Sequence, residues 1–152
     1  MKLVNRFVLH VLLATSALAL SVDAVADMRI STASNPSWKA ECGSCHLAYP
    51  PSLLPADSWR VLTSGLDKHF GVDAKSAVEI GAFLQKNAGR NRGASSKPIL
   101  RITETPWFKH EHDEVGASVW KNPKVKTASN CTACHSGAEQ GNFSEHGVRI
   151  PR

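Results

Sequence analysis

Two pentapeptides of the form C-x-x-C-H constrain this chain more than any other feature: Cys42-Gly43-Ser44-Cys45-His46 and Cys131-Thr132-Ala133-Cys134-His135. This pattern is the attachment signature of c-type haem. Two thiols at this spacing can each form a thioether with one vinyl group of a porphyrin, and the histidine that follows then lies beneath the ring, where its imidazole binds the iron. The two motifs use all four cysteines of the chain. We therefore predict two c-type haems, with thioethers from Cys42, Cys45, Cys131 and Cys134 and with His46 and His135 as iron ligands.

Two other uses of C-x-x-C explain the pattern less well. A structural zinc site usually draws its remaining ligands from a second, separated pair, and not from a histidine that abuts each C-x-x-C. A thioredoxin-like redox pair needs a βαβ pattern nearby, and the sequence contains none. Since haem attachment uses every cysteine, no thiol is left for a disulfide.

The N-terminus has the organisation of a secretory signal peptide. Lys2 and Arg6 form a positive region, Phe7 to Leu20 are predominantly apolar, and Ala24-Val25-Ala26 is an A-x-A cleavage site. The apolar stretch is shorter than the roughly 20 residues that a membrane-spanning helix needs. We predict that residues 1–26 are removed by cleavage after Ala26. We also predict a periplasmic protein, because covalent haem attachment takes place after export. No later segment is apolar enough to span a membrane.

The composition limits the kinds of partner. The chain has a net charge of +5, but its lysines and arginines do not form runs, which argues against nucleic-acid binding. The mild excess of positive charge gives only weak support for steering toward an acidic protein. A chain of this length can bury a moderate core, and two porphyrins would supply much of it. We therefore expect little stable structure without haem.

The first half of the chain after the signal peptide is predicted to contain two helices. Residues 27–40 are expected to be irregular. A helix then opens near Pro55 and is broken by Gly71, and one face of it carries Trp59, Leu62, Leu66 and His69. A second helix is predicted to begin with the capping box Ser76-Ala77-Val78-Glu79 and to end near Gly89.

The second half begins after a polar, glycine-containing stretch from Gly89 to Pro98, which is typical of an inter-domain linker. Thr105-Pro106 predicts a helix start, and a loop is expected to hold Val119 and Trp120. Ser129-Asn130 predicts the cap of a helix that carries the second motif. We predict a mainly α fold of two small haem-binding units with long loops, formed by residues 27–92 and 93–152.

A six-coordinate haem iron needs a second axial ligand, usually methionine or histidine in electron-transfer proteins. After removal of the signal peptide the chain has one methionine, Met28, close to its N-terminus. Methionine ligation of both haems is therefore impossible. The candidates that remain are His69, His110, His112 and His146.

Helical geometry separates these candidates in part. His69 follows the apolar face of the predicted first helix, in the same unit as the first haem. His112 shares a face with Phe108, four residues earlier, whereas His110 falls on the side of the helix directed toward solvent. His146, in the short tail after the second motif, competes with His112 for the second iron. The residues alone favour His69 for the first haem and His112 for the second, with His146 or His110 as alternatives.

Beyond the two motifs, the chain resembles the small bacterial dihaem cytochromes c often called DHC. The resemblance covers nearly all of the chain after the signal peptide and depends on short segments around both motifs and on the C-terminal end. These segments are Glu41 to His46, Tyr49-Pro50-Pro51, Leu54-Pro55, Ser58-Trp59, His69-Phe70-Gly71, Thr105-Pro106-Trp107 with His112, Asn130 to His135, and Val148 to Pro151.

The resemblance implies two low-potential haems with bis-histidine ligation, the distal ligands being His69 and His112, and an N-terminal unit similar to class I cytochromes c. It also implies electron transfer. Electrons would come from a membrane b-type cytochrome and pass, in some members, to a small soluble haem protein that binds oxygen.

The predicted function is periplasmic electron transfer by a monomer with no catalytic residues. Two imidazoles on each iron would leave no position for a substrate, and histidine ligation omits the thioether that raises the reduction potential. The alternative is a haem enzyme, such as a peroxidase or a nitrogen-oxide reductase. Its second iron would be open if neither His112 nor His146 bound it, and Arg149 or His110 could then act as acid or hydrogen-bond donor. A gas-binding or sensory module is a third possibility, without any signalling domain to support it.

Overall fold

The computed structural model describes Ile30 and residues 33–66, 71–90 and 97–152. The predicted signal peptide with its cleavage site, Met28, His69 and the middle of the predicted linker lie outside the described residues. In the described part of the chain, no helix is long and apolar enough to cross a membrane.

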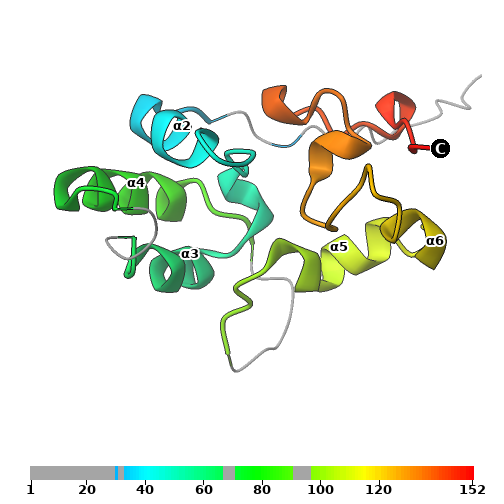
Figure 1. Ribbon diagram of the computed structural model, residues 1–152. Coiled ribbons are helices and arrows are strands. Elements are labelled where there is room, and N and C mark those ends of the chain that lie inside the picture. The colour runs from blue at the N-terminus through cyan, green and yellow to red at the C-terminus, as the bar shows by residue number, and fades with distance from the viewer. Residues whose placement is uncertain (1–29, 31–32, 67–70, 91–96) are drawn as a thin grey trace, which may run out of the picture.

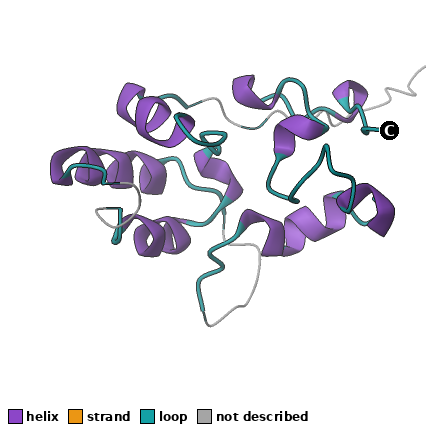
Figure 2. Ribbon diagram, viewed as in Figure 1, coloured by secondary structure: helices purple, strands orange, loops and turns teal. Residues whose placement is uncertain are grey.

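The described residues form helices, single 3₁₀ turns and loops (Figure 2). Their only β-type pairing is two isolated bridges, Pro55 with Gly89 and His135 with Val148. The helices are α2 (Pro36–Gly43), α3 (Ala56–Thr63), α4 (Ala74–Lys86), α5 (Pro106–Glu111) and α6 (Ala117–Trp120). The 3₁₀ turns are η2 (Pro51–Leu53), η3 (Ile102–Glu104), η4 (Cys131–Ala133), η5 (Ala138–Gln140) and η6 (Glu145–Gly147). The prediction of a mainly α fold is confirmed.

Helix α2 corrects one prediction, because part of the segment expected to be irregular is helical. Asn35 is the N-cap, and its side-chain oxygen accepts a hydrogen bond of 2.8 Å from the backbone N–H of Trp38. Pro36 follows at the first helical position, where its missing N–H costs nothing. The helix ends at Gly43, so that Cys42 lies in its last turn.

Helix α3 begins beside Pro55, as predicted, but it ends at Thr63, well before Gly71. Side-chain hydroxyls explain the early end, because they bond to backbone carbonyls near the C-terminus of the helix. The hydroxyl of Thr63 donates to the carbonyl of Trp59 at 2.8 Å, and that of Ser64 donates to the carbonyl of Val61 at 2.7 Å. The regular helix therefore does not reach the segment around His69.

The N-cap of helix α4 lies three residues earlier than predicted, and the capping-box prediction for Ser76 is wrong. Asp73 is the N-cap, and its carboxylate accepts hydrogen bonds of 3.0 Å from the backbone N–H groups of Lys75 and Ser76. Aspartate is among the preferred N-cap residues, and it leaves Ser76 inside the first turn. Hydrogen bonds from Ser76 hold the pKa of Asp73 below its ordinary value.

The C-terminal part contains shorter elements than expected. Thr105 caps α5, as predicted, by accepting a hydrogen bond of 3.1 Å from the N–H of Phe108. The loop expected around Val119 instead contains the one-turn helix α6. The second motif lies on a single 3₁₀ turn, not on a longer helix, and the Asn130 side chain does not cap that turn. It donates instead to the carbonyl of Val125 at 3.0 Å.

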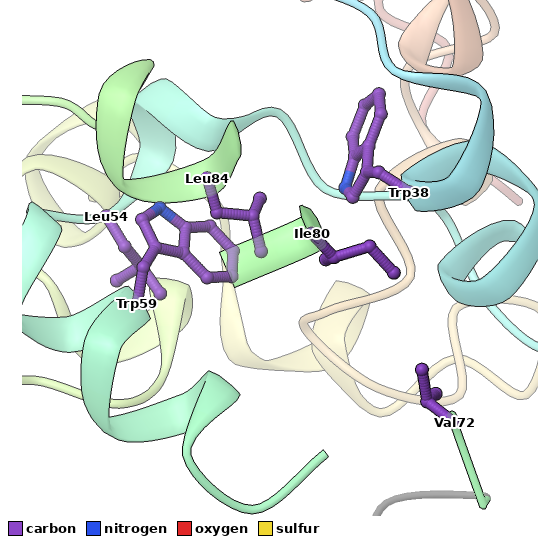
Figure 3. Close-up of a cluster of buried hydrophobic side chains, with 6 residues drawn as sticks. All are labelled: Trp38, Leu54, Trp59, Val72, Ile80 and Leu84. Atoms are coloured by element: carbon purple, nitrogen blue, oxygen red, sulfur yellow. The ribbon is translucent and has the colours of Figure 1, made fainter. Parts of the chain in front are cut away.

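The hydrophobic core lies among α2, α3 and α4, which are together on one side of the molecule (Figure 1). In Figure 3, Leu54 and Leu84 lie against the indole of Trp59, and Ile80 lies on the side toward Trp38. The indole N–H of Trp59 donates to the carbonyl of Pro51 at 2.6 Å, so this buried polar group is satisfied. The core consists of Trp38, Leu54, Trp59, Val72, Ile80 and Leu84.

The C-terminal part has fewer buried apolar side chains, namely Phe108, Val125 and Ala138. Figure 1 shows α5, α6 and the turns of this part on the other side of the molecule from α3 and α4. Ile102, from the second predicted unit, packs against the core of the first.

Gly89 marks a close approach of two backbone segments. Its N–H donates to the carbonyl of Leu54 at 2.9 Å, and a Cβ at this position would overlap the carbonyl oxygen of Ser52. Only glycine fits such an approach without displacing the backbone. The glycine predicted as a helix cap therefore serves a different purpose, which is to attach the segment after α4 to the loop before α3.

Candidate functional site

A cavity of about 380 Å³ opens beside the first C-x-x-C-H motif. Cys42, Cys45 and His46 contribute to one part of its wall. Side chains of the hydrophobic core, among them Trp59 and Ile80, contribute to the rest. A mostly apolar cavity of this size with a few polar side chains is typical of a cofactor site.

A second cavity, of about 410 Å³, opens beside the second motif. Cys131, Cys134 and His135 line it from the motif. His112, at the C-terminal end of α5, and Trp120, at the end of α6, also line it. The second cavity therefore has an imidazole from the motif and another from a separate element.

The two cavities are direct neighbours. Ile102, Phe108 and Cys131 line both of them. Phe108 is only 8% exposed, and its side chain lies in the wall that the two cavities share. Groups bound in the two cavities would be separated by little more than one layer of side chains.

His112 is oriented by Phe108, four residues earlier in the chain. The two rings stack with centroids 4.1 Å apart and planes inclined by 17°. Nδ1 of His112 lies 2.9 Å from the carbonyl oxygen of Phe108. Because a carbonyl can only accept, the proton of the neutral ring is on Nδ1, and Nε2 is the potential metal ligand. The predicted pairing of these two side chains on one helical face is confirmed.

The rings of His112 and His135 lie with their centroids 6.1 Å apart and their planes inclined by 72°. Imidazole nitrogens bind a metal ion at about 2 Å. With a further distance of about 1.1 Å from nitrogen to ring centre on each side, two imidazoles on opposite sides of one metal have centroids about 6 Å apart. The observed separation therefore has room for a metal between the rings.

His135 has no partner for one of its ring nitrogens. Its Nδ1 is buried and makes no hydrogen bond to any group in the described part of the chain. Burial, and then the nearby charge of His112, lower the pKa of His135. The ring is therefore neutral at pH 7, which is the form that binds a metal.

His46 is oriented differently from the other two histidines. Its Nδ1 donates to the carbonyl of Leu47 at 2.7 Å, which again leaves Nε2 as the potential ligand. Its ring stacks on that of Tyr49, with centroids 5.2 Å apart and planes inclined by 26°. The hydroxyl of Tyr49 donates to the carbonyl of Ser129 at 2.8 Å, and burial raises the pKa of this phenol above its ordinary value.

The remaining candidate ligands occupy distinct positions. The side chain of His110 is 82% exposed and lies 4.0 Å from the carboxylate of Asp113, as its place on the helix predicts. His146 is exposed in η6 and lines the second cavity. The tail that carries it is attached to the motif, because the N–H of Arg149 donates to the carbonyl of Cys134 at 2.8 Å. The structure thus brings His112, His135 and His146 to one cavity, and not His110.

The four thiols are partly or fully exposed to solvent in the described part of the chain. Burial raises the pKa of Cys42, Cys131 and Cys134, so these thiols are neutral at pH 7. No group of three or more potential metal-binding side chains of His, Cys, Asp or Glu converges within the described residues. The two alternative explanations of C-x-x-C therefore receive no support from the geometry.

Comparison with known proteins gives the family of the chain. A family model described as dihaem cytochrome c, DHC, matches residues 38–143. The chain belongs to the dihaem cytochrome c family. It is an electron-transfer protein with two c-type haems. No match was found among curated proteins.

Solved structures agree with the fold of this dihaem cytochrome c. The diheme cytochrome c from Rhodobacter sphaeroides is 42% identical, with a TM-score of 0.65, and the match covers 74% of this chain and 98% of that one. The diheme cytochrome type c from Shewanella baltica is 41% identical, with a TM-score of 0.66, and the match covers 77% of this chain and 93% of that one.

The residues of the cytochrome fit two haems. Each cavity has a mostly apolar wall, both thiols of one motif, and the histidine of that motif, as a covalently attached porphyrin requires. In the second cavity an additional imidazole lies at the separation that one metal ion needs. For the first cavity the predicted second ligand, His69, lies outside the described residues.

Sequence reasoning missed two residues of these sites. Tyr49 appeared only within the family segment Tyr49-Pro50-Pro51, and nothing in that segment indicates its hydrogen bond to a residue 80 positions away. Phe108 was predicted as a helical neighbour of His112, but its position between two cavities depends on the tertiary packing.

Proposed function

We propose that this dihaem cytochrome c is a periplasmic electron carrier in which two histidines hold each iron. His46 and His69 serve the first haem, and His135 and His112 serve the second. The thioethers come from Cys42, Cys45, Cys131 and Cys134. When bound, each haem supplies one-electron oxidation and reduction at its iron. The chain orients the imidazoles, excludes other ligands from the iron, and holds the two sites next to each other.

The observation that carries this proposal is the separation of 6.1 Å between the ring centroids of His112 and His135. Both rings line the second cavity, and the unprotonated nitrogen of His112 is fixed by the hydrogen bond from its Nδ1 to Phe108. His146 lines the same cavity, but its side chain is exposed and belongs to a three-residue turn. These differences favour His112 as the second ligand.

His69 is proposed for the first haem from its place in the chain and from the family resemblance. It lies between α3 and α4, and both helices contribute residues to the wall of the first cavity.

The ligand set also supports low reduction potentials for both haems. Histidine at both axial positions omits the methionine thioether that raises the potential. At His46 and His112, the Nδ1–H donates to a backbone carbonyl, which makes the imidazole a stronger donor to a metal. Both effects stabilise the oxidised iron.

A haem enzyme with an open second iron is the competing function. It would need an acid or hydrogen-bond donor in the second cavity, and the sequence offered Arg149 or His110 for that purpose. Neither is among the described residues that line this cavity. Nη1 of Arg149 donates to the carbonyl of Val148 at 2.9 Å, and His110 is exposed. The geometry thus does not support the roles that the sequence offered to these two residues.

The remaining parts of the proposal concern organisation and partners. We propose that residues 1–26 are removed on export and that residues 27–92 and 93–152 each carry one haem. We also propose that the protein is a monomer. The family resemblance supports electron transfer from a membrane b-type cytochrome to a small soluble haem protein or a reductase.

Visible spectra of the oxidised and dithionite-reduced protein, with and without carbon monoxide, test the proposal. We expect two low-spin haems per chain, no methionine-to-iron charge-transfer band, and no change when carbon monoxide is added to the reduced protein. A full equivalent of high-spin haem that binds carbon monoxide would refute bis-histidine ligation at one site and favour the enzyme.

A further inference from the structure

Tyr49 is the only tyrosine of the chain, and it contacts the histidine of the first motif and the loop that precedes the second. Its ring stacks on the imidazole of His46, and its hydroxyl donates to the carbonyl of Ser129 at 2.8 Å. Ser129 lies two residues before Cys131, the first thiol of the second motif. One side chain thus connects the histidine of the first haem site to the attachment loop of the second.

The backbone of Tyr49 is held firmly. Pro50 and Pro51 follow it, and both are buried. A proline restricts the residue before it to extended conformations and fixes its own φ angle. The carbonyl of Pro51 also accepts the indole N–H of Trp59, which anchors this segment to the core. The position of the phenol ring is therefore determined by the core of the N-terminal part.

The carbonyl of Ser129, which accepts the hydrogen bond from Tyr49, is also held in place by its neighbours. The carbonyl of Ser129 also accepts the backbone N–H of Cys131 at 3.0 Å, so movement of this carbonyl is transmitted directly to the first thiol of the second motif. The next residue, Asn130, donates from its side chain to the carbonyl of Val125, which is only 1% exposed. The loop is thereby attached to a fully buried residue of the C-terminal part.

Cys131 lines both cavities, whereas Tyr49 lines only the first. A displacement of Tyr49 would therefore change the position of Cys131 at the partition between the two cavities. We propose that Tyr49 is a positioning residue that sets the geometry of the second haem from the first site, through its hydrogen bond to the carbonyl of Ser129. This inference rests on the proposed attachment of the haems to the two motifs.

Two substitutions separate the two contacts of Tyr49. Tyr49→Phe keeps the ring on His46 and removes the hydrogen bond. Its effect should appear mainly at the second haem, as a changed pattern of haem-methyl NMR shifts in the oxidised holoprotein and a shifted midpoint potential. Tyr49→Leu removes the stacking as well, so it should change the signals of both haems. Ser129→Ala retains the carbonyl and removes only the exposed hydroxyl, which lies 2.9 Å from that of Thr127. It serves as the control, with the second haem unchanged.

The proposal is overturned if Tyr49→Phe leaves the methyl shifts and the potential of the second haem at their wild-type values. It is also overturned if Ser129→Ala changes them as much as Tyr49→Phe does. The number of haems per chain and their spin state, measured on the same samples, report separately on the attachment and ligation that the proposed function requires.

The wild-type holoprotein provides a measurement that does not depend on a stable variant. Labelling with ¹³C-tyrosine gives signals from one residue, because the chain has a single tyrosine. We expect nuclear Overhauser contacts from the labelled ring to protons of Ser129 and His46, and a shift of the ring signals when the second haem is reduced. A Tyr49 ring with no contact to Ser129 would refute the link.

Discussion

Replacement of His112 by alanine is the sharpest test of the second haem site. The change removes the hydrogen bond to the carbonyl of Phe108, worth about 1 kcal/mol, and the stacked ring contact at 4.1 Å, worth about 1 kcal/mol. The loss of free energy of unfolding should thus be about 2 kcal/mol, in addition to the lost bond to iron. The thioethers should retain the haem. One of the two haems should become high-spin and bind carbon monoxide, while the other keeps its low-spin spectrum.

The matched control is His110→Ala, two residues before His112 and within α5. The His110 side chain is 82% exposed, so its removal should change neither haem and should cost no more than about 0.5 kcal/mol of stability. Spectra with carbon monoxide and denaturant unfolding of the holoproteins measure both effects. If His146→Ala opens the second haem and His112→Ala does not, the assignment made from the ring geometry is wrong.

Three further results are expected. Gly89→Ala should lower the free energy of unfolding by about 2 kcal/mol, because the new Cβ would overlap the Ser52 carbonyl. The control is Gly65→Ala, which should change the free energy of unfolding little, because no atom lies within 4 Å of its new Cβ. Equal effects of the two substitutions would refute the close approach of Gly89 to Ser52. The pKa of Asp73 is lower in the folded protein than in the unfolded chain. The ionised Asp73 carboxylate therefore stabilises the fold fully at pH values above the ordinary aspartate pKa, and this stabilisation is lost as the pH falls through the lowered pKa. The stability difference between wild type and Asp73→Asn, followed by unfolding at several pH values, should shrink toward acid, and a constant difference would contradict this. Finally, the 72° between the planes of the second site's two imidazoles should give one low-spin electron paramagnetic resonance signal with an unusually large principal g-value; two signals typical of parallel ligand planes would contradict it.

Local signals predicted some elements correctly and failed at others for identifiable reasons. Thr105 and Pro106 are adjacent cap and first-turn residues, and they predicted the start of α5 correctly. The end of α3 was missed because hydroxyls of Thr63 and Ser64 bond to helix carbonyls, a competition that apolar periodicity does not reveal. The start of α4 was assigned to Ser76 because aspartate and serine are both good caps.

In the candidate sites too, the sequence predicted local features and missed those that depend on tertiary packing. Motif spacing and helical position predicted that His112 would stack on Phe108 and that His110 would be exposed, because both properties are local to one helix. The contact between Tyr49 and Ser129 joins distant segments, and the orphan nitrogen of His135 depends on the packing around it. Such features follow from the tertiary structure, and a single sequence carries no pattern for them.

The uneven distribution of buried side chains has a consequence for how the protein is made. During synthesis the N-terminal segment emerges first, and it contains all six residues of the main hydrophobic core. The C-terminal segment brings only Phe108, Val125 and Ala138 to the interior. A precursor that has received only its first cofactor can therefore already resist proteases in its N-terminal part. Its C-terminal part, with fewer buried apolar side chains, would stay more open until the second cofactor arrives.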